Sequence, residues 1–88
     1  MNTVFKPSFL RCIRKINNHV LLNNIEQIIL SVENAATAKD IPELKKLKGY
    51  KKFYRIKLGD YRIGVSIEND TVTLIICMHR KDIYKFFP

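Results

Sequence analysis

The chain has 88 residues, of which 47% are hydrophobic, and its sixteen Lys and Arg against eight Asp and Glu give a formal net charge of +8. This length predicts one domain over residues 1–88 with a modest core, and the apolar content excludes a disordered chain. The positive charge indicates a polyanion, an acidic protein or an anionic membrane surface as the partner, while the absence of a long apolar run and of signal-peptide features predicts a cytoplasmic protein.

The N-terminal segment predicts a short strand followed by a helix. Val4 and Phe5 form an apolar pair typical of a short strand. From Phe9 onward apolar residues recur at helical spacing, which predicts a helix over residues 8–17 with Ser8 as its N-cap.

A second helix is predicted over residues 20–35, after a break at Asn17 and Asn18. Its apolar stripe consists of Leu21, Ile25, Ile28 and Val32, widened by Leu22 and Ile29. Two helices joined by so short a break form an antiparallel hairpin. Their apolar faces then need a third surface to cover them.

Residues 53–78 supply that surface, because they alternate apolar and polar side chains through three runs separated by the two-residue turns Gly59-Asp60 and Asn69-Asp70. Such turns fix the register of the strands. Across the second turn the expected pairs are Glu68 with Thr71, Ile67 with Val72, Val65 with Leu74, Ile63 with Ile76, Arg62 with Cys77 and Tyr61 with Met78. The predicted fold class is α+β, with an N-terminal strand, a helical hairpin and a three-stranded antiparallel meander in one sheet.

The two faces of this meander differ sharply in chemistry. The face expected to meet the helices carries Tyr54, Ile56, Leu58, Tyr61, Ile63, Val65, Ile67, Val72, Leu74, Ile76 and Met78. The other face carries Arg55, Lys57, Arg62, Gly64, Ser66, Thr73, Cys77 and His79. The register places Lys57 opposite Arg62, although like charges in such pairs destabilise a sheet. It also places Arg55 opposite Gly64, where a ligand or another backbone has room to approach, so this face predicts an anion site.

Further basic residues surround the predicted anion site. They are Lys45, Lys46, Lys48, Lys51 and Lys52 before the meander and Arg80 and Lys81 after it. A solvated surface is as good an interpretation of the first five as an RNA-binding patch. Near the C-terminus, Tyr84, Phe86 and Phe87 are typical of a tail that packs on the edge of the sheet, although a tyrosine beside cations is also suited to stack on an exposed base.

Thiols and imidazoles are too few and too scattered to indicate a metal or cofactor site. Cys12 and Cys77 lie far apart and lack the CxxC spacing of zinc and redox motifs, so we expect both to be packing residues, with a disulfide as the less favoured alternative. His19 and His79 have no clustered carboxylates or thiols around them. The sequence therefore predicts no metal and no cofactor.

The chain also lacks a recognisable nucleophile motif and a glycine-rich phosphate loop. Any catalysis must then rely on Lys, Arg, His and Tyr. Cationic groups stabilise the extra negative charge of a phosphorane-like transition state, and a lysine among other cations can take a proton. Cleavage of RNA by its own 2'-hydroxyl requires little more than these groups.

The segment YRIKLGDYRIGVSIENDTVTLIICMHRKDIY, residues 54–84, resembles the RelE/ParE superfamily of toxins from toxin-antitoxin pairs. The most specific part is YRIKLGDYRI followed by an apolar strand that ends in His79-Arg80 and then by Tyr84. The resemblance covers almost the whole chain. It implies a ribosome-dependent mRNA interferase of the RelE branch, which cuts mRNA in the ribosomal A site and is held inactive by an antitoxin.

The resemblance also implies roles for individual residues. The matching positions are Arg55, Lys57, Arg62, Arg80 and Tyr84, with His79 as a further acid or base candidate. Lys57 or Arg55 would be the base, and Lys57 is favoured because an arginine stays protonated. Arg62 would stabilise the transition state, Arg80 would act there or protonate the leaving group, and Tyr84 would orient or stack a base. Glu43 loosely matches a catalytic glutamate of one branch.

Two other functions remain open on the same fold. A ParE-like inhibitor of DNA gyrase would need no nuclease chemistry, and such inhibitors generally do not keep Lys57, Arg62, Arg80 and Tyr84 together. A catalytically inactive module that binds RNA or an antitoxin is the other alternative. In every case the expected protein partner is an antitoxin with an acidic or amphipathic segment.

Overall fold

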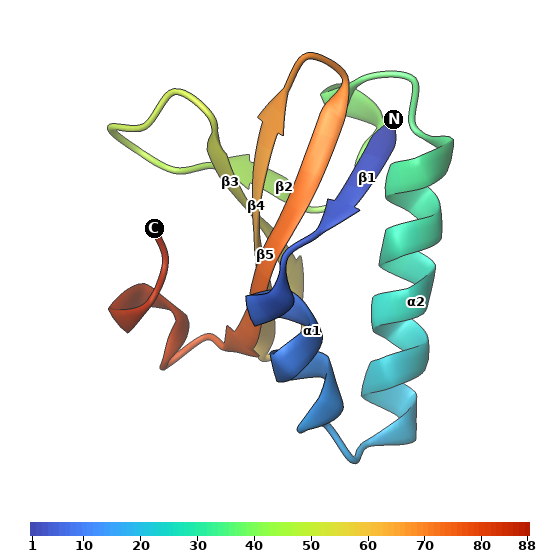
Figure 1. Ribbon diagram of the computed structural model, residues 1–88, viewed down its shortest axis with the longest axis vertical. Coiled ribbons are helices and arrows are strands. Elements are labelled where there is room, and N and C mark those ends of the chain that lie inside the picture. Colours follow the sequence, from blue (N-terminus) through green and yellow to red (C-terminus); the bar gives the residue numbers. More distant parts are fainter.

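A computed structural model describes residues 1–88 and consists of two helices and a five-stranded sheet (Figure 1). The elements are β1 (Asn2–Phe5), α1 (Pro7–Arg14), α2 (His19–Asn34), β2 (Leu44–Lys46), β3 (Phe53–Leu58), β4 (Tyr61–Glu68) and β5 (Thr71–His79), with short 3-10 helices at Ala38–Asp40 and Ile83–Lys85. The strand order is β1-β5-β4-β3-β2. β1 runs parallel to β5 and all other neighbours are antiparallel, which confirms the predicted α+β class.

The edge strand β2 was not predicted. Its three residues pair with β3, with Lys45 opposite Arg55. The sequence placed this segment in a polar connection, because one apolar residue, Leu44, between charged neighbours gives no alternation to detect. The sheet is therefore one strand wider than the sequence indicates, and the extra strand adds Lys45 to the basic face.

The two helices start in different ways. In α1, Lys6 occupies the N-cap position without a side-chain hydrogen bond and Pro7 begins the helix. The predicted cap at Ser8 is wrong, since its hydroxyl donates to the carbonyl of Ile75 in β5 instead. In α2, Asn18 is the cap: its Oδ1 accepts a hydrogen bond from the backbone N–H of Leu21 at 3.1 Å. No helix has the length and apolar character required to span a bilayer.

The main core lies between the helices and one face of the sheet, as the apolar periodicity predicts. The helices contribute Phe9, Ile25 and Val32, and the strands contribute Ile56, Ile63, Val65, Val72, Leu74 and Cys77. α2 and the C-terminal segment lie on opposite sides of the strands in Figure 1. The opposite face of the sheet is therefore free of the helices.

The register of β3 and β4 is as predicted, with Lys57 opposite Arg62. Counted from the turn at Asn69-Asp70, the predicted register of β4 and β5 is correct as far as the pair Val65 and Leu74. Beyond that pair, Gly64 lies opposite Ile76, and Ile75 is an extra residue in β5. This β-bulge reverses the orientation of every later side chain in β5.

The reversed residues are those placed wrongly by the sequence. Cys77 enters the main core, whereas Ile76 and Met78, predicted for that core, belong to a second cluster. Ile76 there contacts Ile83 and Phe87 of the C-terminal segment. The tail thus packs on the sheet as predicted, but on the face opposite the helices and not at the edge.

Candidate functional site

Three cationic side chains project together from the helix-free face of the sheet. Arg55 and Lys57 alternate along β3, and Arg62 of β4 pairs directly with Lys57. One surface hollow is lined by Glu43, Leu44, Lys45, Arg55, Lys57 and Arg62. The predicted grouping of these three cations on one face is confirmed, and the unpredicted strand β2 forms one wall of the hollow.

Arg62 is the most unusual member of this group, because its side chain is only 8% exposed. Its Nη1 donates to the backbone carbonyls of Gly59 at 2.7 Å and Tyr61 at 2.8 Å. Its Nε has no hydrogen-bond partner, and no carboxylate lies within salt-bridge distance of the guanidinium. A buried cation without a counter-ion is costly, and an anion bound from solution would offset that cost.

A second hollow adjoins the first at Arg62 and is lined by Arg62, Arg80, Lys81 and Tyr84. Arg80 is held by the turn before β4: its N–H donates to the carbonyl of Asp60 at 2.7 Å, and its Nε lies 3.7 Å from Oδ1 of the same residue. The hydroxyl of Tyr84 accepts a hydrogen bond from Nη1 of Arg55 at 2.8 Å. This bond links the two hollows, so Arg55, Arg62, Arg80 and Tyr84 form one site.

The electrostatic balance of the site is strongly positive. The protein contains two ion pairs, Arg80 with Asp60 and Lys85 with Asp82, and both are exposed. Arg55 and Lys57 have no carboxylate partner. The only acid that lines the first hollow is Glu43, which the sequence matched loosely and which has a left-handed backbone with φ of 58°. Strained backbone of this kind is often found at functional sites.

His79 does not lie with the other predicted catalytic residues. The bulge at Ile75 turns it to the helix side of the sheet, where its ring meets that of Tyr61 edge to face at 5.7 Å. Its Nδ1 accepts a hydrogen bond from the N–H of Lys81. Its placement on the basic face was wrong, and the sequence could not show it because the bulge has no signature in an apolar run.

The predicted RNA-binding lysines separate into three groups. Lys45 and Lys81 each line one of the two hollows. Lys46 pairs with Tyr54, whose side chain packs against the main core, so Lys46 points to the helix side. Lys48, Lys51 and Lys52 are exposed in the connection between β2 and β3.

The gap expected beside Gly64 is filled by the protein itself. A Cβ on Gly64 would lie 2.8 Å from ring atoms of Phe87, which is 5% exposed. Of the two expected occupants, a ligand or another stretch of backbone, neither is seen, because the ring of Phe87 from the chain's own tail takes the space over the glycine. The sequence signals for this contact were Gly64 and the apolar residues of the tail, but nothing in the sequence showed that the two meet.

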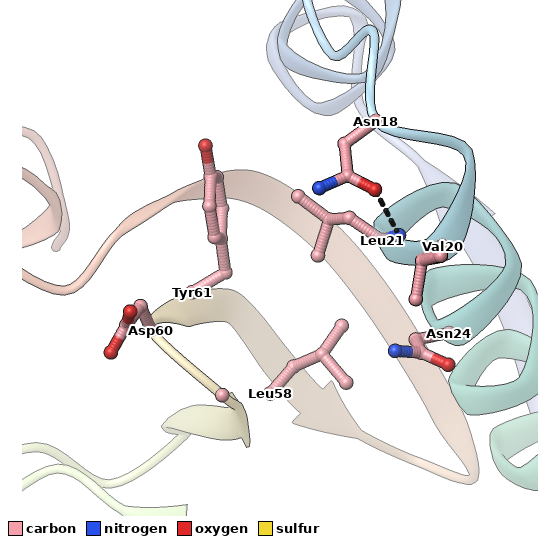
Figure 2. Close-up of a pocket in the computed structure, with 8 residues that line it drawn as sticks. Asn18, Val20, Leu21, Asn24, Leu58, Asp60 and Tyr61 are labelled. Carbon is pink, nitrogen blue, oxygen red and sulfur yellow. Dashed lines mark hydrogen bonds between the residues drawn. The ribbon is translucent and has the colours of Figure 1, made fainter.

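A separate pocket lies between the start of α2 and the turn Gly59-Asp60, which binds Arg80 (Figure 2). Its lining residues are Asn18, Val20, Leu21, Asn24, Leu58, Gly59, Asp60 and Tyr61. None of them is a cation, and Figure 2 shows the hydrogen bond from Leu21 to Asn18 at its rim. The pocket therefore differs in chemistry from the basic site on the other side of the sheet.

Neither cysteine belongs to the site. Both are free, and Cys77 is buried in the core. Burial raises the pKa of its thiol from 9.0 to about 12, with a smaller contribution from nearby Cys12. No group of three His, Cys, Asp or Glu side chains lies close enough to hold a metal ion.

Comparison with known proteins identifies the family. Residues 4–84 match the family described as the ParE toxin of type II toxin-antitoxin systems, parDE. The chain is 35% identical, over the full length of both proteins, to Toxin RelE3 of Methanocaldococcus jannaschii. The protein therefore belongs to the RelE/ParE superfamily and is a RelE-like toxin of a toxin-antitoxin system.

Solved structures support the same assignment. The toxin in a RelB-RelE antitoxin-toxin complex from Methanococcus jannaschii is 32% identical and superimposes with a TM-score of 0.81, covering 97% of this chain and 99% of that one. An archaeal RelE-RelB complex from Pyrococcus horikoshii OT3 has a TM-score of 0.73 at 15% identity and covers 92% and 96% of the two chains. The second likeness shows the fold alone, and together they confirm the predicted RelE-like architecture.

Proposed function

We propose that this toxin is a ribosome-dependent endoribonuclease that cleaves mRNA without a metal ion and thereby inhibits translation. The observation that carries the proposal is the buried guanidinium of Arg62, which lacks a counter-ion and has an unpartnered Nε. It lies where two cationic hollows meet. A phosphodiester of RNA is the anion that fits a cleft of this charge with a tyrosine at its edge.

The reaction that the site supports is attack by the 2'-hydroxyl of RNA on the adjacent phosphate. Lys57 accepts the proton of that hydroxyl, the P–O bond to the departing 5'-oxygen breaks, and the products are a 2',3'-cyclic phosphate and a 5'-hydroxyl. Arg62 stabilises the extra negative charge of the transition state. Arg80 acts on the same charge or supplies the proton to the leaving oxygen, and Tyr84 stacks on a base.

Glu43 is the second candidate for the base. It is the one carboxylate among the cations of the first hollow and is not paired in a salt bridge. Glu43→Gln and Lys57→Met separate the two candidates, because replacing the true base lowers kcat by about 100-fold or more while replacing the other leaves catalysis largely intact.

A cognate antitoxin is the proposed protein partner. Two of the solved relatives are toxins in complex with RelB antitoxins. A partly unfolded, acidic or amphipathic antitoxin segment suits the net charge of +8 and can be removed by proteolysis to release the toxin. Mixing the purified pair should abolish mRNA cleavage.

The decisive experiment is primer extension on a reporter transcript after induction of the toxin in translating cells. Cuts that follow the reading frame are expected from the wild type. Arg62→Ala and Lys57→Ala should remove those cuts without unfolding the protein, whereas Arg14→Ala, an exposed arginine at the end of α1, should behave like the wild type. Undiminished cutting by both site variants contradicts the assignment, and ribosome binding with no cut transcript favours an inactive binding module.

Inhibition of DNA gyrase is the second candidate function, favoured by the match to the ParE family description. The joint presence of Lys57, Arg62, Arg80 and Tyr84 argues against it. The two functions differ in which cellular process, translation or DNA supercoiling, is inhibited first after induction of the toxin. An early loss of DNA supercoiling with intact transcripts supports gyrase inhibition, and an early block of translation supports the ribonuclease.

A further inference from the structure

The C-terminal tail is fixed to the sheet at two points. Ile83 is 1% exposed and Phe87 is 5% exposed, and both pack against Ile76 in the small cluster opposite the helices. The ring of Phe87 rests on Gly64 and meets the ring of Phe53 edge to face at 5.6 Å. A methyl group on Gly64 would overlap the ring, so the tail can lie here only because this residue has no side chain.

Tyr84 lies between these two anchor points and remains 59% exposed. The short helix that carries it is closed by hydrogen bonds from the N–H groups of Phe86 and Phe87 to the carbonyl of Ile83, at 3.0 and 2.9 Å. The backbone of Tyr84 is thus set by the burial of Ile83 before it and Phe87 after it. From this short helix, Tyr84 lines the second hollow of the basic site.

Gly64 also lies next to Arg55, the residue that hydrogen-bonds to Tyr84. Gly64 pairs directly with Arg55 across β3 and β4, and Arg55 donates to the Tyr84 hydroxyl at 2.8 Å. Phe87, Gly64, Arg55 and Tyr84 therefore form a closed chain of contacts. We therefore expect a shift of the ring to move the tyrosine away from the arginine that it contacts.

We propose that Phe87 seated on Gly64 is a positioning pair, which holds Tyr84 against Arg55 at the edge of the basic site. The proposal rests on the proposed ribonuclease function for its effect on catalysis, and on the structure alone for its effect on the Arg55–Tyr84 contact. Phe87 touches no substrate. It acts through Tyr84, so the tail helps to position a residue of the site in addition to covering the sheet.

The experiment combines kinetics on purified mRNA-ribosome complexes with a crystal structure of the variant. Phe87→Ala should lower kcat by about 10- to 100-fold per folded molecule with a smaller change in KM, because misplacement by about an ångström is enough for such a loss. Phe87→Leu, which keeps a buried side chain, should restore most of the rate. Phe86→Ala is the matched control, since Phe86 is 62% exposed and belongs to the same tail.

A double variant tests whether Phe87 acts through Tyr84. Phe87→Ala should cost nothing further when Tyr84 is already alanine, because the positioned group is gone. Losses that multiply in the double variant overturn the proposal. A wild-type rate in folded Phe87→Ala overturns it as well.

The structural readout separates this proposal from the ribonuclease assignment. In crystals of Phe87→Ala, or of Gly64→Ala if the first variant does not fold, the hydroxyl of Tyr84 should lie beyond hydrogen-bond distance of Arg55 Nη1. An unchanged contact in either variant refutes the positioning role. A wild-type protein that cuts no RNA would instead refute the proposed function and leave this structural test standing.

Discussion

The two faces of the sheet are built from the same strands but are covered very differently. On the helix face, Ile63 and Val65 of β4 are completely buried beneath α1 and α2. On the other face, their neighbours Arg62 and Gly64 are also buried, but in a different way: the short tail lies over Gly64, whereas Arg62 lies at the junction of two open hollows. Strand alternation divides the residues between the two faces. The face covered by the two helices forms the main core, whereas the face covered only by the short tail keeps the basic site.

The largest expected effect comes from the helix face. Leu74→Ala should lower the free energy of unfolding by about 2–5 kcal/mol, because it leaves a cavity beneath two helices. Thr73→Ala, on the other face of the same strand, should change it by about 0.5 kcal/mol or less. Urea denaturation of both variants measures the difference. Equal losses would show that the helix-free face is as tightly packed as the core.

Most of this division between faces could be predicted from the sequence. The register of β3 and β4 is correct throughout, because a two-residue turn at Gly59-Asp60 fixes which residues face each other. The error in β5 begins at Ile75. Residues 74–78 are all apolar, so no polar residue marks the point at which the bulge exchanges the faces.

Strand register predicts which cations share the candidate site, and the family resemblance predicts Tyr84 beside them, whereas the contact of Phe87 with Gly64 was not predicted. Lys57 and Arg62 are neighbours by strand pairing alone, whereas the contact of Phe87 with Gly64 joins segments that are distant in the sequence. The bond from Arg55 to Tyr84 depends on that contact in turn. Sequence patterns carry little information about such contacts, because they report on which face a residue lies and not on what covers it.

The second prediction concerns the cost of a buried cation on the open face. Arg62→Met should raise the free energy of unfolding by about 1–2 kcal/mol, because it removes a buried charge with no counter-ion and an unpartnered Nε. The same variant should lose mRNA cleavage. Thermal unfolding measures the expected gain in stability, and primer extension measures the expected loss of cleavage.

Arg14→Met is the control for that variant, since Arg14 is exposed at the end of α1 and should shift stability by about 0.5 kcal/mol or less. Destabilisation by Arg62→Met would mean that its two hydrogen bonds to backbone carbonyls outweigh the cost of the buried charge.

The third prediction uses Cys77, which the bulge turns into the main core. Its pKa is about 12 in the folded protein and 9.0 in the unfolded chain, so its contribution to stability is complete below pH 9 and decreases as the pH rises toward 12. Between pH 8 and 10 the wild type should therefore lose about 1 kcal/mol more than Cys77→Ala does. Parallel pH profiles of the two proteins would contradict the placement of this thiol.

The smallest effect is expected at the exposed rim of the basic site, where Asp60 pairs with Arg80. Their side chains are 72% and 55% exposed, so Asp60→Asn should change the free energy of unfolding by less than about 1 kcal/mol. The backbone hydrogen bond from Arg80 to the carbonyl of residue 60 survives the change and keeps the arginine in place. In the wild type, Asp60 offsets part of the positive charge that Arg80 presents to a phosphate. With that carboxylate removed, the salt dependence of single-stranded RNA binding should steepen by up to about 0.7 in the slope of log K against log salt. A slope identical to that of the wild type would show that the rim of the site, unlike Arg62 at its centre, does not contact the nucleic acid.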